Sequence, residues 1–383
     1  MLDAKARKAY RELIQPRYQR AKKKVKAKVL DEFCAVCGYN RKYAIQLLQK
    51  PFRYRKTKKK PGPKSSYHEK GLVKALMRIW LESDQACSKR LKVIIPLWLP
   101  YYEKHYGELS ETYKEKLLTI SAATIDRLLK PIRDLLVLKK RKSPAPGTLL
   151  KHQIPLKKDV LWDTTRPGFV EADTVAHCGN SMRGDYAWSL TFTDINTTWT
   201  EIRAVWNKGA TAVVQQIKDI EEHLPFLILG FNSDNGTEFL NVYLITYFQN
   251  KSSPVTFSRS RPFIKNDNAH VEQKNWTHVR HLFGYIRLKQ PGVVALMNDL
   301  YANEWRLYQN FFMPTMKLIY KNRIGARYQK RYDKPMTPYQ RVLASPYVTE
   351  EQKQKLILEY QNLDPFLLRK TIERKVKNIL KIN

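Results

Sequence analysis

The stretch Phe226-Leu-Ile-Leu-Gly-Phe-Asn-Ser-Asp-Asn-Gly236 decides how the middle of the chain folds. Its apolar part, 226–231, is short and is followed by turn-forming residues, which is typical of a buried strand rather than a helix. Residues 235–236 turn the chain, and the amphipathic run 237–244 predicts the start of a helix. Asp234 therefore falls at the carboxyl end of a strand, where open α/β sheets bind their ligands.

Further strand and helix patterns surround this stretch. Strands are predicted at 168–173, 186–195, 198–206 and 255–257, and helices at 209–223 and from residue 270 onward. Glu171 and Asp173 share one face of their strand, because side chains alternate along a strand. In 186–195 the apolar side chains at 188, 190 and 192 alternate with small polar ones, which predicts an aromatic stripe inside the sheet.

Three carboxylates in this region have the chemistry of a metal site. Asp173 and Asp234 belong to two strands, and Glu272 lies in the first turn of the following helix. Carboxylate oxygens are preferred ligands of Mg²⁺ and Mn²⁺, and a two-ion site assists phosphodiester displacement. Each residue alone also has a structural explanation. Asp-Asn-Gly forms ordinary turns, and a Glu near the start of a helix interacts favourably with the helix dipole. Rival ligands for such ions are Glu171, Asp194, Glu238 and Asp267.

The three carboxylates occur in recognisable motifs. These are Val170-Glu-Ala-Asp-Thr174, Ser233-Asp-Asn-Gly-Thr-Glu-Phe239 and Lys265-Asn-Asp-Asn-Ala-His-Val-Glu-Gln-Lys-Asn275. Together they resemble the Asp, Asp, Glu triad of bacterial insertion-sequence DDE transposases, whose catalytic core is of the retroviral-integrase type. Thirty-seven residues, 235–271, separate Asp234 from Glu272, which is close to the spacing of that family. The resemblance covers residues 165–290.

The resemblance implies a fold and an activity. The fold is an α/β core of RNase H-like type, a five-stranded mixed sheet with flanking helices. The activity is that of a DNA transposase, a metal-dependent polynucleotidyl transferase that cuts the ends of a mobile element and joins them to target DNA. Asp173, Asp234 and Glu272 would be its catalytic residues and would bind two Mg²⁺ or Mn²⁺ ions. The implied partners are double-stranded DNA, as terminal inverted repeats and as target, and further copies of the chain on that DNA.

Composition independently favours a polyanionic partner. The 383 residues carry a net charge of +35, and Lys and Arg outnumber Asp and Glu by 37 to 13 in residues 1–150 and by 25 to 10 in 251–383. Residues 151–250 hold 8 basic and 12 acidic residues, so an acidic middle lies between basic ends, typical of a nucleic-acid binder. Without a membrane-length apolar run or a disulfide framework, we expect a cytoplasmic, nucleoid-associated prokaryotic protein that does not bind membranes.

The N-terminal region has the pattern of a DNA-binding module. Helical spacing over 25–36, a break at Gly38, and renewed helical spacing over 41–48 predict a helix-turn-helix, with Arg41 and Lys42 placed to contact DNA. An ordinary helical hairpin remains the alternative. The pair Cys34 and Cys37 lacks further ligands for zinc, and both are expected to be small core residues on a helix. The linker 52–67 contributes further basic DNA-binding candidates, Lys58, Lys59 and Lys60.

A second helical module is predicted over 68–136. Its last helix, capped by Ser121, resembles the second half of a helix-turn-helix, with Thr124, Arg127 and Lys130 available for DNA. On the helix of Glu272, spacing predicts that Trp276 and Val279 pack against the core. Three basic residues on and after that helix are candidates for phosphate contact: Lys274, Arg280 and Arg287.

The predicted organisation is therefore all-α helix-turn-helix modules, an RNase H-like core and a mostly helical, basic C-terminal extension that binds DNA or a second subunit. The boundaries are 1–51, 52–67 (linker), 68–136, 137–164 (linker), 165–290 and 291–383. Two other functions remain open from sequence. One is a catalytically inactive DNA-binding regulator derived from a transposase, and the other is an RNase H-like nuclease without strand transfer.

Overall fold

The structure, a computed structural model, describes residues 3–50, 67–137, 163–234, 236–253, 255–260, 269–325 and 327–383. The chain divides into two compact units, Met1–Ser65 and Ser66–Asn383. Among the described residues, no helix combines the length and the apolar character needed to cross a membrane.

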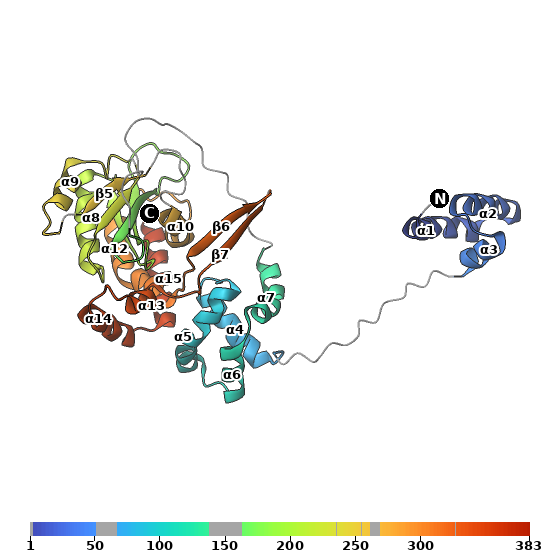
Figure 1. Ribbon diagram of the computed structural model, residues 1–383, viewed down its shortest axis with the longest axis horizontal. Helices are drawn as coiled ribbons and strands as arrows, with labels where there is room; N and C mark the ends of the chain where they lie inside the picture. The colour runs from blue at the N-terminus through green and yellow to red at the C-terminus, as the bar shows by residue number, and fades with distance from the viewer. Residues whose placement is uncertain are drawn as a thin grey trace. The chain divides into compact units, whose positions relative to one another are not determined.

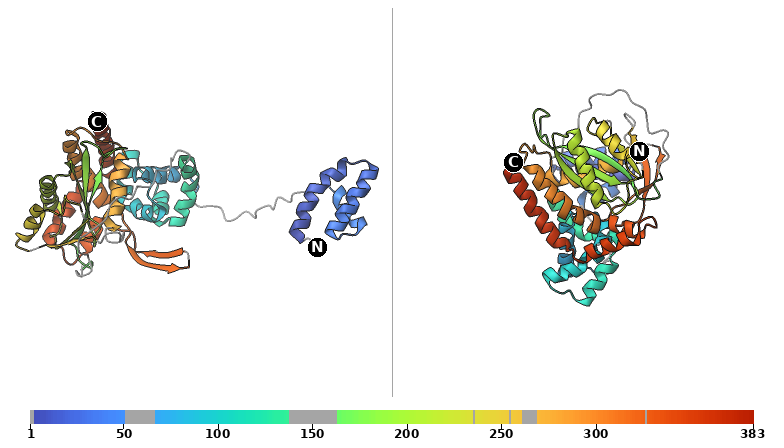
Figure 2. Two further views of the ribbon diagram at one scale, coloured as in Figure 1. Left: turned by 90° about the horizontal axis from the view of Figure 1, so that it is seen from above. Right: turned by 90° about the vertical axis from the view of Figure 1, so that its left-hand side faces the viewer.

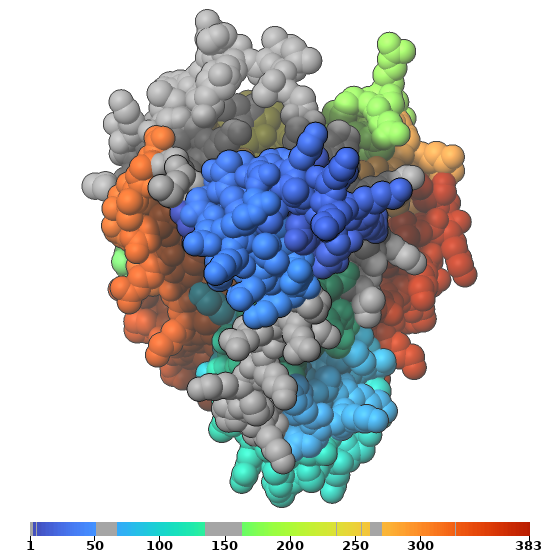
Figure 3. Space-filling view, turned by 90° about the vertical axis from the view of Figure 1, so that its right-hand side faces the viewer, coloured from blue at the N-terminus to red at the C-terminus, as the bar shows by residue number. Residues whose placement is uncertain are grey.

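The first unit is a bundle of three helices. These are α1 (Ala4–Arg20), α2 (Lys23–Cys37) and α3 (Arg41–Gln49). Gly38 ends α2 with a left-handed φ of 68°, and the Asn40 side chain accepts the Lys42 N–H at 3.0 Å to begin α3. Val29, Leu30 and Phe33 are buried between the helices. Figure 3 shows no deep hollow in the surface of this unit that faces the viewer (blue). The predicted helices of 25–36 and 41–48 are therefore present, and α1 was not anticipated.

The second unit begins with four helices. These are α4 (Lys70–Glu82), α5 (Ser88–Tyr106), α6 (Glu111–Thr119) and α7 (Ala122–Val137). The Ser121 hydroxyl accepts the Thr124 N–H at 3.1 Å, so the predicted cap of the last helix is confirmed. Trp98 of α5 is fully buried against Phe366, with ring centroids 5.0 Å apart, and against Phe312. These helices thus share one hydrophobic core with the rest of the unit. The boundaries predicted from sequence had assigned the residues of this core to three separate regions.

A five-stranded mixed sheet forms the centre of the second unit. Its strands are β1 (Phe169–Ala176), β2 (Ala187–Asp194), β3 (Thr200–Trp206), β4 (Gly230–Ser233) and β5 (Thr256–Arg259). They lie in the order β3-β2-β1-β4-β5; β1 is antiparallel to β2 and parallel to β4, and β4 is parallel to β5. This is the predicted RNase H-like arrangement, and it puts β1, which contains Asp173, beside β4, which Asp234 directly follows.

Helices cover both faces of this sheet. They are α8 (Ala210–His223), α9 (Val242–Gln249), α10 (Ala269–Lys274), the π-helix η1 (Asn275–Arg280), α11 (His281–Phe283) and α12 (Val293–Leu300). Figures 1 and 2 show α8 and α9 on one side and α10 and α12 on the other. Because both faces are covered, the polar side chains Ser189, Thr191 and Thr193 of β2 are buried along with Leu190 and Phe192.

The C-terminal part contains helices and one two-stranded ribbon. It comprises the π-helices η2 (Tyr301–Trp305) and η3 (Tyr308–Phe312), the strands β6 (Leu318–Ile324) and β7 (Arg327–Tyr332), and helices α13 (Pro338–Ala344), α14 (Glu350–Gln361) and α15 (Pro365–Ile382). Every described residue of β6 and β7 is exposed, and Figures 1 and 2 show the ribbon projecting from its unit. The sequence pattern did not predict this ribbon.

Two boundaries around Asp234 differ from prediction. The strand expected at 226–231 begins only at Gly230, and Leu227 is 71% exposed. The helix expected from residue 237 begins at Val242, because the Asn241 side chain caps it by accepting the Leu244 N–H at 3.0 Å. The segment on either side of Asp234 is therefore less regular than its apolar content suggests, but Asp234 still follows a buried strand directly.

Candidate metal and DNA site

Asp173 is the carboxylate most constrained by its neighbours. Its Oδ2 accepts the Asn275 side-chain amide at 2.7 Å, and its Oδ1 accepts the Thr174 N–H at 2.7 Å. Burial, together with the negative charges of Asp234 and, more weakly, Glu272, raises the pKa of Asp173 to about 7. Asp234 and Glu272 therefore both lie near enough to Asp173 for their charges to act on it.

Asp234 lies beside Asp173 because of the register of two parallel strands. Ala172 of β1 is opposite Ser233 of β4, so the next residue on each strand path is one of the two aspartates. Asp234 Oδ1 accepts the Gly236 N–H at 3.1 Å. Burial raises its pKa, and the nearby carboxylate of Glu238 acts in the same direction.

Glu272 reaches this edge of the sheet on α10. The buried Glu171 carboxylate accepts the N–H groups of His270 and Val271, at 3.1 and 3.2 Å, and so attaches the first turn of α10 to β1. Asn275, one helical turn after Glu272, makes the second attachment through Asp173. The Glu272 side chain itself is exposed.

The carboxylates fit hard divalent cations by chemistry, although they are not closed around one. Among the residues that the structure describes, no three His, Cys, Asp or Glu side chains are grouped closely enough to hold a metal ion. The donors are nevertheless the oxygens that Mg²⁺ and Mn²⁺ prefer. The repulsion that raises the pKa of Asp173 is also what a bound cation would relieve. We therefore treat Asp173, Asp234 and Glu272 as a fitting ligand set.

The rival ligands have other partners. Buried Glu238 accepts the Thr174 hydroxyl at 2.9 Å and pairs with Lys208 at 3.0 Å. Buried Asp194 accepts N–H groups of Gly168 and Thr197. Glu171 caps α10 as described above, and Asp267 lies outside the described residues.

Sequence reasoning missed two residues of this site, Asn275 and Lys208. Each acts on a carboxylate from a distant part of the chain, Asn275 on Asp173 and Lys208 on Glu238. The only sequence signal for Asn275 is its position three residues after Glu272, on the same helical face. For Lys208 we find no such signal.

The predicted DNA contacts of the helical modules are mostly at the surface. Arg41 and Lys42 are exposed at the start of α3, where Arg41 forms an ion pair with Asp31. Thr124, Arg127 and Lys130 follow one another along α7 at three-residue spacing, with Arg127 and Lys130 exposed. Lys58, Lys59 and Lys60 lie outside the described residues.

The residues near Glu272 that were predicted to contact phosphate are more buried within the protein than expected. Lys274 is only 6% exposed, and burial together with Arg90 and Arg341 lowers its pKa to about 7, so it does not lie on the open surface. Arg280 is half-buried over the Tyr285 ring, 4.7 Å from its centroid.

Arg287 uses its guanidinium to hold a loop. It donates to four backbone carbonyls, those of Cys178, Ser181, Arg183 and Asp185, at 2.6–3.2 Å. Arg287 therefore stabilises this loop, whether or not it also contacts DNA. On the helix of Glu272, Val279 is buried as predicted, but the prediction for Trp276 was wrong, since its side chain is 53% exposed.

His177 belongs to the core rather than to the carboxylate site. Its Nε2 shares a hydrogen bond of 2.8 Å with the Ser189 hydroxyl, and its ring packs on Phe283. Burial lowers the pKa of His177 to about 3, with a smaller effect from the charge of Arg280. The His177 imidazole is therefore neutral in the folded protein at neutral pH.

The stability conferred by His177 should depend on pH. Because its pKa is lowered on folding, its contribution is complete above pH 6.5 and is lost as pH falls toward 3. The difference in unfolding free energy between wild type and His177→Gln should shrink by about 3 kcal/mol between pH 7.5 and pH 4.5. Urea unfolding of both proteins across this range measures it. A difference independent of pH would contradict this assignment.

The attachment of α10 to β1 should also be measurable. Glu171→Ala leaves two N–H groups without their acceptor and should lower the unfolding free energy by about 2–3 kcal/mol. Glu171→Gln keeps one acceptor oxygen at the same place and should cost about half as much. Equal losses in the two variants, measured by urea unfolding, would show that the hydrogen bonds contribute little.

Comparison with known proteins identifies one relative along most of the chain. No protein-family model matches the sequence. The "Uncharacterized protein y4rM" of Sinorhizobium fredii is 38% identical over 335 residues, which is 86% of this chain and 93% of the relative.

Two solved structures show weaker similarity. The HTLV-2 integrase catalytic core domain in complex with magnesium is 14% identical, with a TM-score of 0.29, over 40% of this chain and 92% of that chain. The BIV integrase catalytic core domain is also 14% identical, with a TM-score of 0.28, over 45% of this chain and 91% of that chain. The strand order, rather than these alignments, defines the fold of the core. At the level of sequence, the chain belongs to the same protein family as y4rM of Sinorhizobium fredii.

Proposed function

We propose that this protein is a DNA transposase that cuts the ends of a mobile element and joins them to target DNA. The observation that carries the proposal is the position of three carboxylates at one edge of the sheet. Asp173 lies in β1 and Asp234 directly follows the neighbouring parallel strand β4, and α10 brings Glu272 to the same region through its attachments to β1. Such an edge is where sheets of this kind bind ligands.

The side chains have distinct tasks in this proposal. Asp173, Asp234 and Glu272 would hold two Mg²⁺ or Mn²⁺ ions, which when bound activate the attacking oxygen and neutralise charge on the phosphate. Asn275 orients Asp173 by its hydrogen bond, and Glu171 fixes the start of the helix that carries Glu272.

The reaction consists of two phosphodiester displacements. In the first, water attacks the phosphodiester at the element's end, and the released 3′-hydroxyl takes up a proton. In the second, that hydroxyl attacks a phosphodiester of target DNA, so one bond forms as another breaks. No covalent intermediate with the protein is required.

Basic surfaces support DNA as the partner. The first unit presents Arg41 and Lys42 at the start of α3, in the position of a recognition helix. The β6–β7 ribbon carries five basic residues and no acidic residue between 318 and 332. We propose that these surfaces bind terminal repeats and target DNA, and that several copies of the chain assemble on them, because two ends must be joined together.

A second candidate is a DNA-binding regulator without catalytic activity. The exposed side chain of Glu272 favours it, because a closed metal site would draw this carboxylate toward the two aspartates. In that case the core would serve only as a scaffold between DNA-binding surfaces.

Plasmids carrying the inverted repeats that flank this gene distinguish the candidates. With the full-length protein and Mg²⁺, a transposase cuts at the repeat ends and yields joined products, and a metal chelator abolishes both reactions. A nuclease would cut without joining. A regulator would bind the repeats and do neither, which would refute the proposal.

A further inference from the structure

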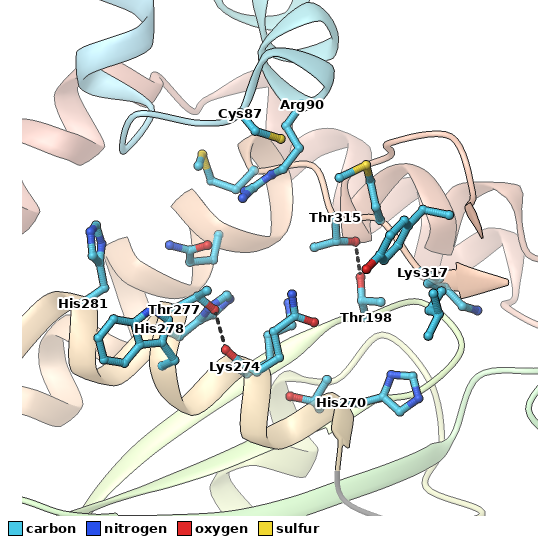
Figure 4. A pocket seen from close by; sticks show the side chains of 18 of the residues that line it. Cys87, Arg90, Thr198, His270, Lys274, Thr277, His278, His281, Thr315 and Lys317 are labelled. Atoms are coloured by element: carbon cyan, nitrogen blue, oxygen red, sulfur yellow. Dashed lines mark hydrogen bonds between the residues drawn. The ribbon is translucent and has the colours of Figure 1, made fainter. Parts of the chain in front are cut away.

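A cavity of 820 Å³ lies on the side of α10 and η1 that does not carry Glu272. It is lined by the turn before α5 and the start of α5, by the helix from α10 to α11, by the end of β2 and the turn after it, by η3 and the residue after it, and by the base of the β6–β7 ribbon. Figure 4 shows Arg90 reaching into it from α5 and Lys274 from α10. Its volume is within the range of pockets that bind small ligands, and it is too small for a double helix.

The cavity is strongly basic. Arg90, Lys274, Lys317 and Lys321 line it. The only carboxylate among its described lining residues is Asp84, which is already paired with Arg369 at 2.6 Å. The excess of positive charge therefore lacks an acidic partner within the described lining.

Lys274 and one nitrogen of Arg90 are also buried. Lys274 is 6% exposed, and its side-chain amine has no hydrogen bond or ion pair with another described residue. The buried Nε of Arg90 has no hydrogen-bond partner among the described residues. Burying a cation without a counter-charge costs several kcal/mol, and a bound anion would remove that cost. Lys317 differs, because its Nζ donates to the Asn196 carbonyl at 2.8 Å.

An aromatic rim accompanies these cations. Trp276 and Tyr332 line the cavity, and each has an exposed side chain, 53% for Trp276 and 44% for Tyr332. Basic groups beside exposed aromatic rings are the usual features of sites that bind single-stranded nucleic acid, where phosphates meet the cations and bases stack on the rings.

We propose that this cavity binds the phosphates of one unpaired DNA strand next to the catalytic carboxylates. Lys274 is two residues from Glu272 and therefore on another side of α10, so a strand that leaves the carboxylate edge passes over this one helix to enter the cavity. The choice of DNA as the polyanion rests on the proposed function. The cavity, its charge and its aromatic rim do not depend on it.

Cys87 gives a local readout, because it lines the cavity and is the exposed cysteine among the four. The full-length protein carrying Asp234→Asn is treated with a maleimide in the presence of a chelator, and mass spectrometry follows the alkylation of Cys87. A single-stranded oligothymidylate at about ten times its Kd should slow this alkylation about tenfold. Binding of the oligonucleotide without protection of Cys87 would overturn the proposal.

Matched variants assign the protection to the cavity. Arg90→Gln should abolish it, whereas Lys92→Gln, which removes one charge from an exposed position of the same helix, should keep it. Lys321→Gln should also weaken protection, because Lys321 lines the cavity. Equal protection of Cys87 in Arg90→Gln and Lys92→Gln would remove the site from the cavity. Similar thermal midpoints of Arg90→Gln and Lys92→Gln exclude misfolding as the cause.

Other ligands test the identity of the occupant. Protection by duplex DNA or by an oligouridylate that equals protection by the single DNA strand would overturn the assignment to unpaired DNA. Equal protection by inorganic pyrophosphate would show that the cavity binds small anions rather than a DNA strand, which would overturn the proposal. Since no step requires cleavage, a failure of transposase activity leaves this result unaffected, and the two hypotheses fail separately.

Discussion

Asp173→Asn, Asp234→Asn and Glu272→Gln should each lower the rate of end cleavage about a thousandfold or more, with little change in affinity for the terminal repeats. Each substitution removes a negative charge from the ligand set, and metal stabilisation of a phosphodiester transition state is worth several kcal/mol. The folded structure should tolerate the changes at the two aspartates, because burial and nearby carboxylates raise the pKa values of Asp173 and Asp234 and already disfavour their charged forms. Single-turnover cleavage of labelled repeat DNA measures the effect.

Glu222→Gln is the matched control for these variants. It removes one carboxylate from an exposed position on α8 of the same core and should cleave at the wild-type rate. Cleavage by Asp234→Asn at a rate near that of Glu222→Gln would show that the carboxylate edge is not the catalytic site.

Removing charge from the β6–β7 ribbon should strongly reduce binding to duplex DNA. The combined variant changes four exposed residues to Gln: Arg323, Arg327, Lys330 and Arg331. If each contacts one phosphate, the slope of log affinity against log salt should fall by about 3.6, at about 0.9 per contact. Fluorescence anisotropy of repeat DNA over a range of salt concentrations measures it.

A variant of α15 provides a comparison with the same change in charge. It carries Gln at four exposed basic positions, Lys370, Arg374, Lys377 and Lys381, and should keep most of the salt dependence. If the ribbon variant instead binds DNA normally but changes its assembly state, the ribbon contacts another subunit. Its exposed apolar side chains, among them Ile319 and Ile324, are consistent with that outcome.

Sequence reasoning was most successful where the chain forms a buried sheet. The apolar runs of β1, β2 and β3 and the motifs around Asp173 and Asp234 predicted the order of elements, because strands covered on both faces need nearly continuous apolar or small residues. The ribbon was missed for the opposite reason. Both of its faces are exposed, and its apolar residues do not alternate regularly with polar ones, so no hydrophobic alternation marks its strands.

The helix of Glu272 shows a second limit. Trp276 and Val279 were both assigned to the core from α-helical spacing, but residues 275–280 form a π-helix with a wider turn. The wider turn changes which side chains face the sheet, so Val279 is buried and Trp276 is exposed. The lowered pKa of Lys274 was equally inaccessible from sequence, because it depends on burial and on the charges of Arg90 and Arg341, both distant along the chain.

The contacts that orient the candidate site are also long-range. Asn275 reaches Asp173 across 102 positions, and Lys208 reaches Glu238 across 30. Neither pair is marked by a local motif, so a single sequence identifies the carboxylates but not the residues that hold them. The carboxylates themselves were found because a metal-dependent chemistry limits which side chains can serve.

The most direct test is a crystal structure with Mn²⁺, in which anomalous scattering locates the metal. The proposed function predicts Mn²⁺ bound by Asp173 and Asp234, with the Glu272 carboxylate turned inward to complete the site. Crystals that show no manganese at these aspartates, or manganese there with Glu272 still facing solvent, would contradict the catalytic assignment.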